Sequence, residues 1–397
     1  MNWGTMQEEN RGDPMSAANR LFYHRRLYDL KRTDALFVRA EVENVRHHIA
    51  HCPEYAELLA RLGFTIDSVK TVDDLWRIPP IPTAFLKRHT LYSASPKHLM
   101  FQSTTSGTSG RTSRMGLDWT SAWRGLGMVL GTFLTHRLVS LRPTNHVVLG
   151  YEPAKRNKIG AVKTAYAMTY AALPVHRVFA LKDNGTDYVL NLDGIRAALL
   201  HYEKQGLPVR FMGFPAYFMF LLRELQEAGV RLKLHPKSKV FLAGGWKQFL
   251  SEKVDKPTLY GLSEQVLGIG GDRIKEFFGA VEHPIAYFDC PNHHFHVPVY
   301  ARVIIRDTAL RPVGFGTPGL LNLLTPMMTS MPFSSVMTDD LAVLHPGEEC
   351  GCGNLAPYFD VLGRVGLADI KTCAAGAAEL LNVKPASVAK EADHESR

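Results

Sequence analysis

The chain has 397 residues, of which 46% are hydrophobic, and this is enough to bury one large core or two to three ordinary domains. The net charge is +8, but the basic residues are scattered and form no stripe interleaved with aromatics, so we favour an enzyme with anionic substrates over a nucleic-acid-binding protein. No apolar run is long enough to span a bilayer and the N-terminus is polar, which predicts a cytoplasmic protein.

The predicted elements begin with helices. Apolar residues recur at helical spacing from about Arg20 to Leu62, and this segment ends at Gly63. The prolines at positions 79, 80 and 82 then break any helix and predict a long irregular connector. Further along, short apolar strands such as residues 146–150 and 239–245 alternate with helices, which is typical of an α/β fold.

From about residue 286 the pattern changes to strand-like runs punctuated by glycine and proline, without a long helix. We therefore predict an α/β protein in which a large core precedes a β-rich subdomain. The predicted parts are a flexible N-terminus (1–18), the core with its helical segment (19–285), the β-rich subdomain (286–376) and a short C-terminal tail (377–397).

A polar loop at Ser103–Gly110, with the sequence STTSGTSG, is the first candidate for chemistry. Its hydroxyls and glycines offer side-chain and backbone donors that can surround a triphosphate without a side-chain clash. It is not a Walker loop, since no Gly-Lys-Ser/Thr follows at the required spacing. A flexible linker has the same composition, but this loop lies inside the predicted folded region, which favours the anion-binding alternative.

The loop resembles the phosphate loop of adenylate-forming enzymes, the superfamily of acyl-CoA synthetases, luciferases and peptide-synthetase adenylation domains. Three further motifs follow in that superfamily's order. LYGLSE at Leu259–Glu264 resembles its Tyr-Gly-x-Thr-Glu motif, while MTDDL at Met337–Leu341 and LGR at Leu362–Arg364 resemble its Thr-Gly-Asp and Gly-Arg motifs. Each motif alone is an ordinary surface feature, but four in order favour the resemblance.

The resemblance implies contacts with ATP and magnesium. Tyr260 is expected against the adenine, Ser263 near the phosphate and Glu264 on the magnesium, because a hard cation that bridges phosphate oxygens needs a carboxylate. Asp340 is expected to hold the ribose, with Asp339 where glycine is usual. Ser263 and Glu264 are the expected catalytic residues of this segment. The expected nucleotide-binding residues are Thr105, Ser106, Gly107, Thr108, Ser109, Gly110, Gly244, Tyr260, Gly261, Asp340 and Arg364.

Within this superfamily the chain is most similar to the acyl-protein synthetases of bacterial bioluminescence systems, which are fatty acid–protein ligases, over about residues 70–376. IPPIPTAFLKRH before the loop resembles that family's Ile-Pro-x-x-Pro-x-x-Phe-x-Lys segment. Residues 338–365 resemble its Thr-Glu-Asp-Leu-Gly stretch and the Cys-x-Cys-Gly that follows. The resemblance also implies that the acid binds between residues 213–218 and 243–246, where the superfamily walls its acyl pocket.

ADIKTCAAG places Cys373 where that family has the cysteine that accepts the acyl group from the adenylate. Because a mixed anhydride with AMP is a reactive acyl donor, a nearby thiolate can form a thioester with it. The resemblance therefore implies a catalytic role for Cys373. The alternative, a buried cysteine that acts as a small hydrophobic residue, stays open.

The chain departs from the superfamily after Arg364. Adenylating enzymes usually have a C-terminal domain of roughly a hundred residues, with a lysine whose charge stabilises the adenylate-forming transition state. Only 33 residues follow Arg364, so we expect this lid domain to be truncated or missing. The role of its lysine stays unassigned, and the charged residues considered for it are Lys371, Lys384, Lys390, Arg111 and Lys87.

Cysteine usage points to a metal. The chain has five cysteines and no signal peptide, which argues against a disulfide framework. Three thiols with one imidazole, in two turn-rich clusters, suit a closed tetrahedral zinc of structural type. Phenylacetate-CoA ligases resemble the chain here, with a Cys…His and a Cys-x-Cys-Gly at similar places. His293 and His294 are rival ligands, unligated cysteines are the alternative, and the predicted ligands are Cys290, His296, Cys350 and Cys352.

We predict an AMP-forming acid–thiol ligase that uses ATP and Mg²⁺, with Zn²⁺ as a structural ion. The carboxylate of a fatty or aryl acid attacks the α-phosphate, pyrophosphate leaves, and the acyl group moves to Cys373 or to a thiol of a partner protein. A CoA ligase or an aryl-adenylating enzyme of secondary metabolism differs only after the adenylate. A non-catalytic scaffold protein is the alternative from another class.

Overall fold

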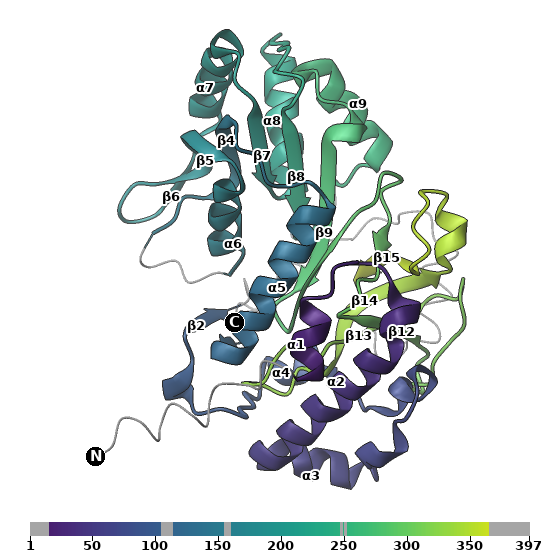
Figure 1. Ribbon diagram of the computed structural model, residues 1–397. Coiled ribbons are helices and arrows are strands. Elements are labelled where there is room, and N and C mark those ends of the chain that lie inside the picture. Colours follow the sequence, from purple (N-terminus) through teal and green to yellow (C-terminus); the bar gives the residue numbers. More distant parts are fainter. Residues whose placement is uncertain (1–15, 105–113, 155–159, 247–248, 250–251, 365–397) are drawn as a thin grey trace, which may run out of the picture.

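The computed structural model describes residues 16–104, 114–154, 160–246, 249 and 252–364 (Figure 1). Its strands form a seven-stranded sheet, a six-stranded sheet and a two-stranded hairpin, with helices packed around them. The predicted α/β class is therefore confirmed. No helix in the described ranges is long and apolar enough to cross a membrane.

The seven-stranded sheet is the centre of an α/β layer. Its central strands are buried on both faces: β4 is buried from Thr144 to Gly150, and its apolar part is Val147–Leu149. Its strands are β4 (Pro143–Tyr151), β5 (Leu173–Asp183), β6 (Tyr188–Leu190), β7 (Val209–Gly213), β8 (Lys239–Ala243), β9 (Ile274–Ala280) and β10 (His283–Phe288). Their order is β10-β9-β8-β7-β4-β5-β6, and β9, β8, β7, β4 and β5 are parallel to one another.

Helices cover both faces of this sheet (Figure 1). One face packs against α5 (Trp119–Thr135) and α6 (Gly160–Met168), and the other packs against α7 (Leu192–Gln205), α8 (Pro215–Glu227) and α9 (Lys256–Leu267). Local signals set the helix ends: Asp255 caps α9 by accepting a hydrogen bond from the Thr258 N–H at 2.9 Å, and Gly268 ends it in the left-handed conformation.

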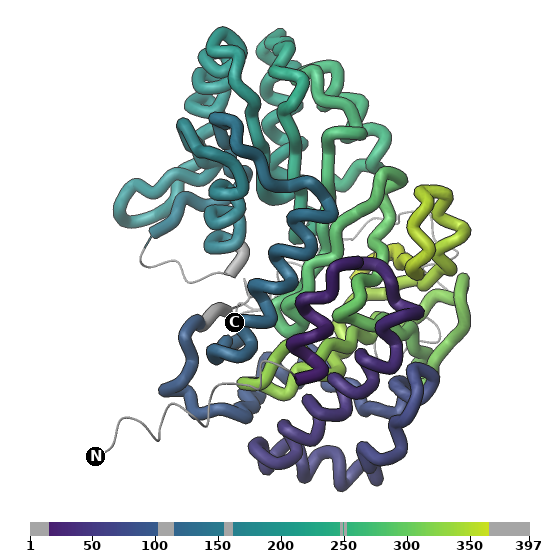
Figure 2. The backbone as a smooth tube through the Cα atoms, in the orientation of Figure 1, coloured from purple at the N-terminus to yellow at the C-terminus, as the bar shows by residue number. Residues whose placement is uncertain are grey.

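The second unit joins the N-terminal helices to the C-terminal strands in one hydrophobic core, and Figure 2 shows these two ends of the described chain side by side. Its helices are α1 (Ala17–Phe22), α2 (Leu30–His51), α3 (Pro53–Arg61) and α4 (Thr83–Leu86). Its strands are β1 (Ile81–Pro82), β11 (Phe295–His296), β12 (Arg302–Arg306), β13 (Gly319–Leu324), β14 (Ser335–His345) and β15 (Tyr358–Arg364), in the order β11-β15-β14-β13-β12 with β1 on β14.

The N-terminal half of the chain agrees with the predicted elements except in its connector. The helical segment is present as α1 to α3, and Gly63 follows it with a φ of +66°. The proline-rich connector is more regular than predicted, because β1 pairs in parallel with β14 and α4 follows it. The predicted boundary between residues 285 and 286 falls inside β10, since this strand continues the seven-stranded sheet.

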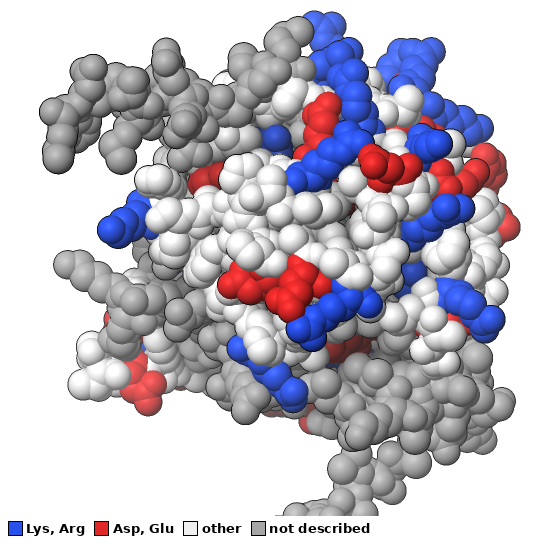
Figure 3. All heavy atoms as spheres, turned by 90° about the horizontal axis from the view of Figure 1, so that it is seen from below, with Lys and Arg blue, Asp and Glu red and all other residues white. Residues whose placement is uncertain are grey.

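The charge distribution on the face seen from below is mixed (Figure 3). Lys and Arg side chains lie next to Asp and Glu side chains on the described part of this face. Ion pairs of the N-terminal helices are of this exposed kind, as between Arg46 and Asp67, whose Nη2 and Oδ1 are 2.8 Å apart. Exposed pairs of this kind contribute little to stability.

Candidate active site

The central parallel strands carry glycines at their carboxyl ends. Parallel strands place these ends along one edge of a sheet, and open α/β sheets bind their ligands outside that edge. Glycine removes the side chain that would otherwise separate the backbone from a ligand. The four positions are Gly150 in β4, Gly213 in β7, Gly244 after β8 and Gly279 in β9.

The backbone conformation at position 213 requires glycine. Its φ is +143°, and a Cβ atom at this position would lie 2.2 Å from the carbonyl oxygen of Leu149. The same carbonyl accepts a hydrogen bond from the Phe214 N–H at 3.1 Å, which joins the ends of β4 and β7. Gly213 also pairs with Leu242 of β8, so the two segments predicted to wall the acyl pocket, 213–218 and 243–246, are neighbours.

The predicted nucleotide-binding residue Gly244 lies in an exposed turn directly after β8. Gly244 and Gly245 both have left-handed conformations, with φ values of +80° and +62°. Trp246 then turns back into the α/β core, where its side chain is buried. This turn leaves bare backbone at the carboxyl edge of the sheet.

The Tyr260 segment lies elsewhere. Tyr260 is in helix α9, and its hydroxyl donates a hydrogen bond to Oε1 of Glu276 at 2.7 Å. Glu276 is the third residue of β9 and pairs with Leu242 of β8. Its ring lies 4.7 Å from the ring of His293. Burial and the neighbouring Glu276 carboxylate raise the pKa of Tyr260. Gly261 follows in the same helix, so both residues belong to α9 and not to the turn after a strand.

The hydroxyl of Ser263 is engaged within the protein. Ser263 is fully buried in α9, and its Oγ donates to the backbone carbonyl of Ile269 at 2.9 Å. Glu264 lies on the same helix, next to Gly270, in the turn that leads into the amino end of β9. This placement does not support contacts of Ser263 or Glu264 with a nucleotide at the carboxyl edge, because α9 holds them at the opposite end of the strands.

A second segment of the same form lies at the carboxyl edge, and the sequence analysis missed it. Phe278, Gly279 and Glu282 repeat the aromatic-Gly-x-x-Glu spacing at the end of β9, in FFGAVE. The signal that separates the two copies is local. Asp255 and Gly268 are helix-capping residues around the first copy, whereas the second follows a strand-like run.

Glu282 has the properties expected of a ligand-binding carboxylate. It lies in the turn between β9 and β10 and is only 4% exposed. Within the described residues, no hydrogen bond or ion pair engages its side chain. A bound cation would offset the cost of holding a carboxylate at such a largely buried position. Phe278 packs instead against Phe359 of β15, with their rings 5.6 Å apart, and so links the two sheets.

Asp340 and Arg364, predicted from separate motifs, are brought together. They face each other as cross-strand partners on β14 and β15, and Asp340 Oδ1 lies 3.6 Å from Arg364 Nε. The carboxylate of Asp340 is mostly buried, with 15% of its side chain exposed, whereas Arg364 is exposed. Burial raises the pKa of Asp340, and the charge of Arg364 opposes this shift.

Asp339 has a structural partner, which leaves Asp340 as the acid of this pair available to a ligand. Lys87 Nζ lies 3.1 Å from Asp339 Oδ2, and the Thr83 hydroxyl donates to Asp339 Oδ1 at 3.1 Å. Both partners lie at α4. Lys87, considered for the charge that steadies the adenylate-forming transition state, is therefore already paired.

Several predicted residues lie outside the described ranges. The structure describes the two strands that flank the phosphate loop, β2 (Phe101–Thr104) and β3 (Arg114–Leu117), which pair as an antiparallel hairpin. The Lys163 ammonium, in α6, lies 4.7 Å from the centre of the Phe101 ring. The predicted residues that fall outside are Thr105, Ser106, Gly107, Thr108, Ser109, Gly110, Arg111, Lys371, Cys373, Lys384 and Lys390.

The four predicted zinc ligands converge although two clusters of sequence supply them. Their ligand atoms all lie within 4.8 Å of one another, and the four residues are Cys290, His296, Cys350 and Cys352. Cys290 Sγ is 3.5 Å from Cys350 Sγ, and Cys352 Sγ is 3.3 Å from His296 Nε2. Three sulfurs and one imidazole nitrogen at this separation fit a tetrahedral zinc.

The surroundings of this cluster orient its ligands. His296 Nδ1 is 2.6 Å from the Ala356 carbonyl oxygen, which directs Nε2 at the thiols. Gly351 and Gly353 take left-handed conformations and let the Cys-x-Cys loop turn sharply. The rival ligands point elsewhere, since His293 Nδ1 contacts Asp289 and His294 Nδ1 contacts Asp360.

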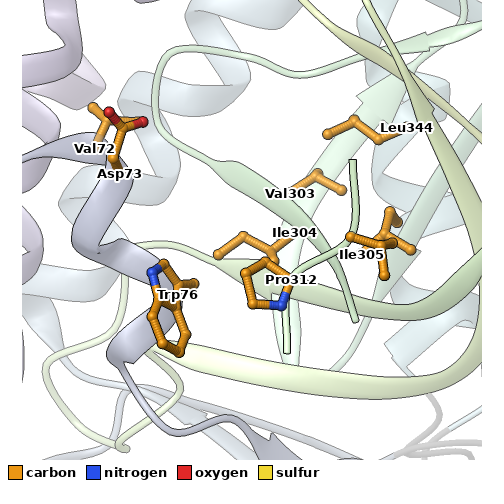
Figure 4. Close-up of a pocket in the computed structure, with 9 residues that line it drawn as sticks. Val72, Asp73, Trp76, Val303, Ile304, Ile305, Pro312 and Leu344 are labelled. Carbon is orange, nitrogen blue, oxygen red and sulfur yellow. The ribbon is translucent and has the colours of Figure 1, made fainter. Parts of the chain in front are cut away.

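A separate pocket of about 200 Å³ lies on the six-stranded sheet, away from the glycine-ended strands. Figure 4 shows Trp76 and Pro312 at this pocket, with residues of β12 around them. Its lining is apolar except for Asp73, so it lacks the donors that a triphosphate needs. We therefore do not assign the nucleotide to it.

Comparisons with known proteins agree with this architecture. The family profile described as acyl-protein synthetase, LuxE, matches residues 23–382. The long-chain-fatty-acid–luciferin-component ligase of Vibrio harveyi is 25% identical over 349 residues, which cover 85% of this chain and 86% of that protein. Two solved structures of 2-hydroxyisobutyryl-CoA ligase with 2-HIB-AMP and CoA share the fold. The open conformation has a TM-score of 0.63 at 16% identity, and the match covers 90% of this chain and 80% of that chain. The thioesterification state has a TM-score of 0.64 at 17% identity, and the match covers 92% of this chain and 75% of that chain.

Proposed function

This chain belongs to the acyl-protein synthetase (LuxE) family, and from this premise we propose that it activates a fatty acid at the carboxyl edge of its seven-stranded sheet. The enzyme is a ligase that forms an acyl-adenylate with ATP and then transfers the acyl group. The name of the Vibrio harveyi relative includes a long-chain fatty acid, which supports this class of acid over an aryl acid.

The observation that carries the proposed location is the row of glycine-ended strands beside Asp340. Bare backbone in the exposed turn of Gly244 and Gly245 lets a ligand approach the strand ends closely. Asp340 offers a carboxylate for ribose hydroxyls. We assign the carboxylate that would hold magnesium to Glu282, because Glu264 lies at the other end of the strands.

In the proposed reaction, a carboxylate oxygen of the acid attacks the α-phosphorus of ATP in line. The bond between the α-phosphorus and the bridging oxygen breaks, and pyrophosphate leaves with that electron pair. Residues 213–218 and 243–246 hold the acid so that its carboxylate faces the phosphate. Magnesium, when bound, supplies positive charge beside the phosphate oxygens.

The second step forms a thioester. A thiolate attacks the acyl carbon of the adenylate, and AMP leaves. We propose Cys373 as the first acceptor and the thiol of a partner protein as the final one, on the resemblance of its surrounding sequence alone. A Cys373→Ala variant that still forms the labelled acyl-protein from labelled acid and ATP would contradict the acyl-enzyme step, and formation of acyl-CoA from added CoA would favour a CoA ligase.

We also propose that zinc occupies the cysteine and histidine cluster as a structural ion, because four protein ligands leave no position for a substrate. It would tie the β10–β11 connection to the loop before β15. Metal analysis of protein purified without added zinc is expected to give one equivalent, and less than half an equivalent argues against the site. The free thiols at this cluster also fit the proposed cytoplasmic location.

The direct test of the activity is exchange of labelled pyrophosphate into ATP in the presence of a panel of carboxylic acids. Exchange that requires a fatty acid supports the proposal. Exchange with aryl acids alone would indicate an aryl acid as the substrate. No exchange with any acid would favour a non-catalytic scaffold.

A further inference from the structure

A row of basic side chains crosses the seven-stranded sheet near the amino ends of its strands. His146 of β4 pairs with Arg177 of β5 on one side and with Arg210 of β7 on the other, and Arg210 pairs with Lys239 of β8. Paired residues of parallel strands point to the same face of a sheet. Four basic residues on four adjacent strands therefore share one face, and this row spans about 14 Å at the usual strand spacing.

The two central members of this row are buried. Arg210 is 5% exposed and His146 is fully buried, and neither ring nitrogen of His146 has a hydrogen-bond partner. Within the described residues, no hydrogen bond or ion pair engages the Arg210 guanidinium or the Lys239 ammonium. The two end members, Arg177 and Lys239, are half-buried, which leaves the row open to solvent at its ends.

The Arg177 guanidinium is held in place without a counter-charge. Its Nε donates to the Thr169 hydroxyl at 2.9 Å, and it lies over the ring of Tyr170, 4.7 Å from the centre. Its Nη2 is buried and has no partner. The hydrogen-bonding capacity of this guanidinium is therefore not used up within the described residues.

The charges near the row are of one sign. Burial lowers the pKa of Lys239, and the positive charges of Arg210, Lys275 and Arg137 lower it further. Burial, followed by Arg210 and Arg177, lowers the pKa of His146 to about 4, so this residue is neutral at pH 7. Lys275 has a carboxylate partner in Asp289, at 3.7 Å, and does not belong to the row.

A buried arginine without a described partner, such as Arg210, is costly, and a bound anion reduces that cost. We propose that the row of Arg177, His146, Arg210 and Lys239 is a binding site for a small anion with two or more phosphate groups. Its length suits several linked phosphates better than one, and arginine and lysine are the usual partners of phosphate oxygens. Because Arg210 lies about 10 Å along β7 from Gly213, this site is separate from the carboxyl edge.

Titration calorimetry of the full chain in EDTA, with tripolyphosphate and pyrophosphate as probes, tests this site. Wild-type protein is expected to bind tripolyphosphate, and Arg210→Met is expected to weaken binding at least tenfold. Arg231→Met, at an exposed arginine outside the row, is the matched control and should bind like wild type. No binding by wild type, or equal binding by Arg210→Met, would overturn the proposal.

Two further arms keep the test decisive. Titration with ADP in the same buffer distinguishes a nucleotide from an inorganic polyphosphate as the ligand. If Arg210→Met loses ADP binding, the ligands include nucleotide phosphates. If wild type binds the inorganic probes alone, the ligand is a polyphosphate. If Arg210→Met does not fold, Lys239→Met at the half-buried end of the row replaces it, with a threefold to tenfold loss expected. Tripolyphosphate should also raise the melting temperature of wild type and not that of the row variants, whereas an equal rise in both would contradict the site.

Discussion

The carboxyl and amino edges of the seven-stranded sheet carry different chemistry. At the carboxyl edge the strands end in glycines, and the buried carboxylate of Glu282 has no described partner. Toward the amino edge, polar groups are engaged within the protein, as where the Ser263 hydroxyl donates to the Ile269 carbonyl oxygen just before β9. The aromatic-Gly-x-x-Glu spacing occurs twice, once inside α9 and once at the end of β9, but only the second copy directly follows a strand of the parallel sheet. This difference indicates that the role of a motif depends more on where the fold places it than on its residue identities.

The largest expected effect comes from replacing Glu282 by glutamine, with the same replacement at Glu264 as the control. Glu282→Gln should lower acid-dependent pyrophosphate exchange by about 10²–10³-fold, because the carboxylate next to the transferred phosphate is lost. Glu264→Gln, its matched control in α9, should stay within about threefold of wild type, since surface-type changes outside the site have small effects. The reverse order of effects would reassign the edge at which ATP binds.

The glycines give a comparison in stability. Gly213→Ala should lower the free energy of unfolding by about 3–5 kcal/mol or prevent folding, because its Cβ would meet the Leu149 carbonyl at 2.2 Å. Gly261 lies in α9 with open space around it, so Gly261→Ala should raise the free energy of unfolding by about 0.5–1 kcal/mol through helix propensity. Urea unfolding measures both, and equal effects of the two changes would contradict the close strand contact at Gly213.

The smallest expected effect concerns pH at the amino edge. The folded-state pKa of His146 is lowered to about 4, so the unfolded chain takes up a proton at this residue that the folded protein does not. Its contribution to stability is therefore present above pH 6.5 and is lost as the pH falls toward 4. Relative to His146→Phe, wild type should lose about 2–3 kcal/mol between pH 7 and pH 4.5, measured by urea unfolding. A constant difference across this range would contradict the burial of a neutral His146.

Much of the fold was predictable from local patterns. The helical segment before Gly63, the α/β alternation and the turn after β8 follow from periodicity and glycine placement. The zinc ligands were predicted from their thiols and imidazole together with a family resemblance, and Asp340 and Arg364 were assigned to the nucleotide site from a resemblance alone. Their direct contacts were not predicted, because pairing across some sixty residues or between strands leaves no local signal. The packing of the N-terminal helices with the C-terminal strands was not predicted, since it depends on tertiary contacts between distant parts of the chain.

The prediction of Tyr260, Ser263 and Glu264 as nucleotide contacts rests on motif similarity alone, and their place in the fold does not support it. The sequence around Tyr260 carries its own helix signals, Asp255 as N-cap and Gly268 as C-cap, and these place the segment in α9. FFGAVE lacks the tyrosine and the hydroxyl of the superfamily motif, so similarity of residues alone ranks it lower. Its position directly after a strand of the parallel sheet is the physical criterion that favours it.

The central claim is that the adenylate forms at the carboxyl edge of the seven-stranded sheet. A crystal structure of the protein with a sulfamoyl analogue of a fatty acyl-adenylate tests this directly. We predict that the ribose contacts Asp340 and that the sulfamoyl group lies by the ends of β8 and β9, near Gly244 and Glu282. Binding of the analogue beside α9, at Tyr260 and Glu264, would contradict this claim.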